Sequence, residues 1–188
     1  MYMFGQALVN GILLGGLYAL IAVGMTLIMG VLKVINLAHG HLMMWGMVVS
    51  FFCFQLLGID PYLSVFISAI LVGLLGMVLQ KWIINPVRFA DVILPESQVL
   101  LTVGIGIVLI EVARLAFGSD YKTITTSYST SAVSLGELSF SVPCLISFGI
   151  AILITALMYF MLVRTDFGKS VRATSEDPDA AALMGVNT

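Results

Sequence analysis

The residues of this chain that could do chemistry are few and lie far apart. His39 and His41 stand two apart at the start of a predicted helix, so their side chains point to different sides, and a metal ion would need more ligands than this pair supplies. Cys53 and Cys144 fall in or beside different apolar segments, without the CxxC or Cys/His spacing of a zinc site. These residue types predict neither a metal centre nor a redox site.

Two short motifs resemble nucleotide-binding signatures without completing them. Gly168-Lys169-Ser170 ends like a P-loop, but that motif needs a glycine where this chain has Val163, at the end of an apolar segment. The pair Gly104 and Gly106 lacks the third glycine and the strand–helix setting of a dinucleotide site, and indicates helix packing instead. The metalloprotease and serine-hydrolase motifs are also missing. We therefore expect no catalytic residue, cofactor or bound metal, and no enzymatic activity.

The composition explains why such motifs are scarce. Hydrophobic residues make up 60% of the 188 residues and charged residues 10%, against roughly 45–50% and 25% in soluble domains. The ten acids and eight bases are spread over loops and form no patch that would hold nucleic acid. The sequence predicts an all-α, polytopic integral membrane protein whose main environment is the lipid bilayer.

Five stretches are long and apolar enough to cross a hydrocarbon core of about 30 Å as helices. They are residues 7–30, 38–57, 62–84, 98–117 and 143–163. Every proline falls between or at the edges of these stretches, as expected if proline marks helix ends. Asp60-Pro61 is predicted to cap and begin the third stretch, and Asn85-Pro86 to stop it. No base precedes the first stretch, and that stretch is too long for a signal peptide, so we expect it to stay in the membrane.

Lysine and arginine set the predicted orientation, because they are retained on the cytoplasmic side. With the N-terminus outside, only Arg114 and Lys122 of the bases lie outside. The others all lie inside: Lys33, Lys81, Arg88, Arg164, Lys169 and Arg172. Residues 118–142 then form an external loop, and residues 164–188 are cytoplasmic. The strand-like end of the loop fits a short hairpin or a loop that lies on the membrane surface.

Small and polar residues near the first two spans suggest helix contacts. Gly11, Gly15 and Ala19 are spaced four apart, with Gly16 beside them, which favours close helix packing and leaves open a lining of a translocation path. Asn36 is predicted to cap the second helix. For His39 we favour a similar interfacial role and leave open a part in a gate or a subunit contact.

Glu111 and Arg114, in the stretch 98–117, are the only charges that look buried in a predicted span. They are three residues apart on one helix face near its outer end, where an arginine can reach the interface and pair with the acid. We expect a local ion pair and leave open a polar group in a substrate path.

The polar C-terminal segment predicts a short, capped helix. Asp177 suits the N-cap, Pro178 the first helical position and Gly185 a left-handed stop, giving about two turns. Because a helix this short is only marginally stable in water, we expect it to form against a cytoplasmic partner protein.

Several stretches together resemble one family. Asn10 to Gly30, Val34 to Gly40, Gly168 to Thr174 and Asp179 to Asn187 are similar to the permease subunit of branched-chain amino acid ABC importers. The resemblance implies a bacterial inner-membrane protein that works with two cytoplasmic ATPase subunits, a second permease subunit and a periplasmic amino-acid-binding protein.

The same resemblance implies a contact site for the ATPase. The Asp179-Ala180-Ala181 sequence, followed by Gly185, resembles the Glu-Ala-Ala…Gly coupling loop of importer permeases, with aspartate in place of glutamate. It implies that these residues contact the ATPase: Asp179, Ala180, Ala181, Leu183, Met184 and Gly185. The predicted domains are a transmembrane region, 1–163, and a coupling segment, 164–188.

Permeases of this family continue with further membrane helices, whereas this chain stops at Thr188, so we expect a fragment or a complementary chain. Urea and short-amide permeases look similar and stay open as alternatives. A self-sufficient carrier and a membrane anchor are the remaining alternatives. The carrier would need ion-coupling carboxylates at the midplane, and the anchor would not need a capped docking segment.

Overall fold

A computed structural model describes residues 2–32, 36–88, 95–135 and 138–185. Lys33, residues 89–94 of the predicted inner loop and Val186–Thr188 lie outside the described residues. The chain divides into two compact units, one formed by residues up to 33 together with 125–188 and the other by residues 34–124. We describe each unit by itself.

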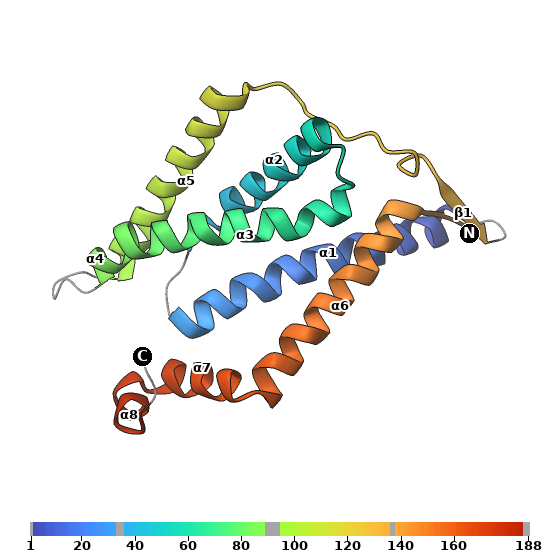
Figure 1. Cartoon of the computed structure of the whole chain (residues 1–188). Coiled ribbons are helices and arrows are strands. Elements are labelled where there is room, and N and C mark those ends of the chain that lie inside the picture. Colours follow the sequence, from blue (N-terminus) through green and yellow to red (C-terminus); the bar gives the residue numbers. More distant parts are fainter. Residues whose placement is uncertain (1, 33–35, 89–94, 136–137, 186–188) are drawn as a thin grey trace. The chain divides into compact units, whose positions relative to one another are not determined.

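The first unit pairs two long helices that are far apart in the sequence. Its elements are α1 (Tyr2–Leu32), β1 (Ala132–Leu135), β2 (Leu138–Ser141), α6 (Val142–Arg164), α7 (Asp166–Glu176) and α8 (Pro178–Leu183). α1 packs along α6, and α7 turns away from the end of α6 and also contacts α1 (Figure 1). At the α1–α6 contact the ring of Phe148 occupies the space that a Cβ at Gly16 would need, so glycine allows the close approach.

The predicted hairpin of the loop is confirmed. β1 and β2 pair antiparallel, with Ala132 opposite Ser141. The side chain of Gln6 binds the hairpin to the first turns of α1: its Nε2 donates to the carbonyl oxygen of Ser139 at 2.6 Å, and its Oε1 accepts from the Ser139 N–H at 3.0 Å. This two-bond clamp mimics a backbone ladder and fixes the strand against the helix.

The second unit packs α2 (His39–Leu57) between two other helices. α3 (Pro61–Leu79) continues into a π-helical segment (Gln80–Ile84) and α4 (Asn85–Arg88), and α5 (Pro95–Phe117) follows. Asp60 caps α3 by accepting the Tyr62 N–H at 2.9 Å, with Pro61 in the first turn, as the sequence predicts. The short turn places α2 and α3 side by side (Figure 1).

Polar contacts also join α5 to α2. The indole N–H of Trp45 donates to the carbonyl oxygen of Leu109 at 3.1 Å, and the imidazole of His41 lies where a Cβ at Gly106 would sit. The fully buried hydroxyl of Thr102 accepts the Leu37 N–H at 3.3 Å. The hydrogen bonds of Trp45 and Thr102 satisfy polar groups within an otherwise apolar interface.

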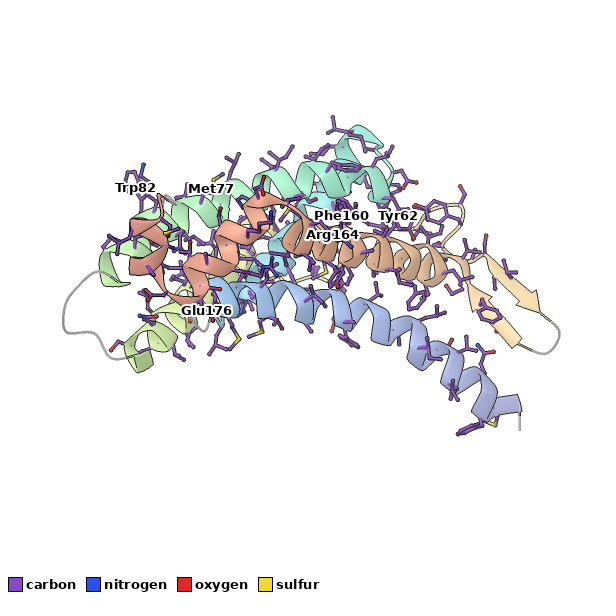
Figure 2. All side chains as sticks on the ribbon, turned by 90° about the horizontal axis from the view of Figure 1, so that it is seen from below. Tyr62, Met77, Trp82, Phe160, Arg164 and Glu176 are labelled. Carbon is purple, nitrogen blue, oxygen red and sulfur yellow. The ribbon has the colours of Figure 1, made fainter. Side chains whose placement is uncertain are left out.

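The five predicted spans are confirmed, with small shifts at their ends. Helices long and apolar enough to cross a membrane cover Met3–Gly30, His39–Leu57, Pro61–Ile84, Ser97–Phe117 and Val142–Arg164. Many apolar side chains on them point outward; Figure 2 shows Met77 and Trp82 projecting away from their helix, where they are 61% and 75% exposed. Such outward apolar surface suits contact with lipid or with further membrane helices.

Two local predictions were wrong. Asn36 does not cap α2: the N-cap residue is Ala38, and Asn36 Oδ1 accepts the Ala38 N–H at 3.0 Å, an Asx turn one step before the helix. The apolar span ends at Ile84, but Pro86 does not stop the helix, because helical structure continues through it to Arg88. The preceding π segment restarts the backbone bonding, so Pro86 falls in the first turn of α4, where no bond needs its missing N–H.

Candidate functional site

The corner between α6 and α7 is organised by a single threonine. Thr165 follows the last residue of α6, Arg164, and its extended backbone ends that helix. The Thr165 hydroxyl donates back to the Met161 carbonyl oxygen. The hydroxyl oxygen of Thr165 also accepts the Gly168 N–H at 3.1 Å. Thr165 therefore closes α6 and caps α7 at once, which fixes the angle between them.

Gly168 allows the two helices to approach at this corner. It is buried, and a Cβ built on it would overlap the backbone carbonyl groups of Leu162 and Met161. Those atoms belong to a helix backbone and cannot rotate away as a flexible side chain could. Position 168 thus requires glycine because the neighbouring backbone leaves no room for a side chain, and not because the glycine backbone is left-handed.

Helix α7 has two distinct faces. One face carries Val171 and Thr174, which are half-buried against the rest of the first unit. The other face carries exposed charged residues: Lys169, Arg172 and Glu176. Lys169 Nζ pairs with Asp166 Oδ1 at 2.9 Å within the first turn, an exposed pair of small energetic value. Figure 2 shows Arg164 at the end of α6 and Glu176 at the end of α7, which mark the two ends of this connecting helix.

Helix α8 follows with the caps that the sequence predicts. Asp177 Oδ1 accepts the Ala180 N–H at 3.1 Å, and Gly185 has a left-handed backbone with φ of +82° just after the helix. Ala181 is 4% exposed, whereas Leu183 and Met184 are 89% and 85% exposed. The helix therefore turns one small residue inward and presents two large apolar side chains to the outside.

The small residues expected to pack in α1 behave differently from one another. A Cβ at Gly11 or Gly15 would meet nothing within 4 Å in the described chain, and Ala19 is exposed, whereas Gly16 contacts Phe148. The face that carries Gly11, Gly15 and Ala19 is thus open here, and its role in packing or in a pathway stays a prediction.

The polar residues near α2 and α5 lie in the second unit. His39 is the first residue of α2 and is half-buried. Arg114 Nη1 pairs with Glu111 Oε1 at 2.9 Å, which confirms the predicted local ion pair. Gly106 packs against His41 as expected of a packing glycine, but Gly104 lines an apolar cavity of about 570 Å³ between α3 and α5.

The residues described above make packing, capping and ion-pair contacts. Within the described ranges no group of three or more His, Cys, Asp or Glu side chains is placed to hold a metal ion. The free cysteines, Cys53 and Cys144, lie in different units. What stands out instead is a chain of capped helices, from α6 through α7 to α8, that ends in exposed apolar side chains.

Sequence reasoning missed α7 as a separate helix and missed Gly168 as a contact residue. The amphipathic spacing of Phe167, Val171 and Thr174 was the available signal for the helix. No sequence pattern announces which carbonyl groups a glycine will touch, because that contact depends on the angle between α6 and α7.

Five helices of the described residues are long and apolar enough to cross a membrane, which defines the class of protein: a polytopic helical membrane protein. Residues 7–188 match the family model described as "Branched-chain amino acid transport system / permease component", and the chain belongs to this family. No solved structure gives a significant match to this chain.

Several curated relatives have names that match this family. The chain is 29% identical to the high-affinity branched-chain amino acid transport system permease protein BraD of Pseudomonas aeruginosa, over 100% of this chain and 64% of BraD. It is 31% identical to LivH of Escherichia coli K12, over 98% of this chain and 63% of LivH. The match to the probable LivH of Methanocaldococcus jannaschii is 30% identical over 95% of this chain and 57% of that protein. The chain thus spans less than two-thirds of the length of these relatives.

Proposed function

We propose that this chain forms part of the permease subunit of an ATP-driven ABC importer for branched-chain amino acids. Its family membership and the transport names of BraD and LivH support this activity. The proposed partners are two cytoplasmic ATPase subunits, a second permease subunit and a periplasmic amino-acid-binding protein in a bacterial inner membrane. Hydrolysis of ATP takes place in the partner subunits.

The observation that carries the proposal is the pair of large apolar side chains exposed at the end of α8. Leu183 and Met184 are almost fully exposed at the end of a capped helix, next to the left-handed Gly185. Exposed large apolar side chains that stand together mark sites where another protein binds. We assign α8 and Met184–Gly185 as the segment that docks on the ATPase, with Asp179 and Ala180 at its start and Ala181 turned toward its own chain.

The α6–α7 corner supports a mechanical role for this segment. α8 is capped by Asp177 at the end of α7, and Thr165 and Gly168 fix α7 to α6. α7 also contacts α1. When the ATPase subunits close and shift α8, the movement reaches two membrane-spanning helices as a rigid-body displacement, which is the kind of change that alternating access requires.

The proposed topology follows from the basic residues. Arg164, Lys169 and Arg172 place residues 164–188 in the cytoplasm, and the N-terminus lies outside. The working division is a transmembrane region, 1–163, followed by a coupling segment, 164–188. A permease for urea or short amides would use the same coupling segment, and uptake of labelled leucine against labelled urea separates the two.

Co-purification with the ATPase tests the docking assignment. The double variant Leu183→Arg, Met184→Arg adds two positive charges at the proposed contact, and Glu176→Arg changes the charge by the same amount on the exposed face of α7. We expect the native chain and Glu176→Arg to retain the ATPase and the double variant to lose it. Equal retention by both variants, or no ATPase with the native chain, would contradict the assignment.

A further inference from the structure

A cavity of about 350 Å³ lies in the second unit, between α2, the end of α5 and the loop that follows. Its apolar wall includes Met44 and Val48 of α2 and Ile110 and Phe117 of α5. Ligand sites typically measure about 300–1,000 Å³, so this cavity is at the small end of the range and suits a small molecule.

The apolar wall is held in place by neighbouring contacts. The ring of Phe117 packs on those of Trp45 and Phe52, with centroids 5.8 Å and 4.9 Å apart. Trp45 is in turn fixed by its hydrogen bond to Leu109. A wall built on two helices with paired aromatic rings is preformed, which lowers the entropic cost of binding.

The backbone after α5 turns the loop toward the cavity. Gly118 has φ of +80° and its N–H donates to the Arg114 carbonyl oxygen at 2.9 Å, the usual left-handed end of a helix. The turn places Ser119, Asp120 and Lys122 among the residues that line the cavity.

The charges at the cavity differ in how far they are neutralised. Arg114 is already held by Glu111 at 2.9 Å and lies 3.5 Å from the Ser119 hydroxyl. Within the described residues, neither Asp120 nor Lys122 takes part in an ion pair. The Lys122 ammonium lies 5.5 Å from the centroid of the Phe51 ring, a contact that holds a cation without cancelling its charge. One anion and one cation thus remain available beside an apolar wall.

We propose that this cavity binds a zwitterionic amino acid with an aliphatic side chain, on the face of the membrane where substrate arrives. Lys122 receives the α-carboxylate, Asp120 receives the α-ammonium, and Met44, Val48 and Ile110 contact the side chain. Opposite charges placed beside an apolar surface recognise this class of ligand, whereas urea offers neither charge nor an apolar group. The inference rests on the proposed transport function, because it assigns a binding site for the proposed substrate within the same permease.

Protection of an introduced cysteine tests the site without using transport or ATP hydrolysis. Val48→Cys places a thiol on the cavity wall, and Tyr121→Cys places one on the same loop, where the native side chain is fully exposed and outside the cavity lining. Both variants are made with Cys53 and Cys144 replaced by alanine, in membranes that contain the rest of the transporter, and are labelled with a small charged methanethiosulfonate.

We expect L-leucine to slow labelling of Val48→Cys several-fold and to leave labelling of Tyr121→Cys unchanged. We expect 4-methylpentanoate and 3-methylbutylamine, each with one of the two charges, not to protect. Lys122→Gln and Asp120→Asn should each remove the protection by leucine.

Three results would overturn the proposal: no protection by leucine, equal protection by a single-charge analogue, or a Val48→Cys thiol that never reacts. Since labelling needs no ATPase, a failure here is distinct from a failure of the docking experiment on α8. If the native chain fails to retain the ATPase while leucine still protects Val48→Cys, only the coupling assignment is removed.

Discussion

Gly168→Ala should weaken the α6–α7 corner. The added Cβ would overlap the backbone carbonyl groups of Leu162 and Met161, and overpacking of this kind costs about 1–3 kcal/mol. Replacing glycine by alanine in a helix returns about 0.5–1 kcal/mol. Because the atoms met are backbone, we expect a net loss of roughly 1–2 kcal/mol, a factor of about 5–30 in the equilibrium between the formed and opened corner.

Hydrogen exchange of the α7 amides, followed by mass spectrometry in membranes, measures this loss. The matched control is Gly15→Ala, where the new Cβ meets nothing within 4 Å of the described chain. Faster exchange in α7 for Gly168→Ala, with no change for Gly15→Ala, is the expected result. Unchanged α7 exchange in Gly168→Ala would refute the argument that this corner is set by a close backbone approach.

Three further substitutions test single contacts. Asp177→Ala removes the acceptor of the Ala180 N–H, and we expect faster amide exchange in α8, equivalent to about 1 kcal/mol. Thr102→Val leaves the Leu37 N–H without this acceptor inside the second unit, and a loss of about 1–3 kcal/mol should lower the thermal denaturation midpoint in detergent. Glu111→Gln breaks only an exposed ion pair, so we expect a stability loss of less than about 1 kcal/mol and a correspondingly small change in the same midpoint; a larger loss would show that the pair is not a local one.

The spans and caps could be read from the sequence because their causes are local. Hydrophobic length sets the five helices, and Asp60 and Asp177 cap the helices that begin beside them. Glu111 and Arg114 pair because one helix turn brings them together.

What the sequence could not show depends on contacts between distant segments. Gly16 and Gly11 look alike in the sequence, yet only Gly16 meets an aromatic ring, which comes from α6. The two-bond clamp between Gln6 and Ser139 joins residues that are 133 positions apart in the sequence. The side-chain oxygen of Asn36 accepts a backbone N–H, but in an Asx turn before α2 and not as its N-cap. The sequence does not separate the two because both use the same side-chain oxygen.

The most direct measurement of the central claim is site-specific photocrosslinking from α8 in intact membranes. A photoreactive benzophenone residue replaces Leu183, and in a matched variant it replaces Phe4, which is also exposed but lies at the far end of α1. The account predicts a crosslink to the ATPase subunit from position 183 and none from position 4. A crosslink to the ATPase from position 4, or none from position 183 in a transport-active complex, would contradict it.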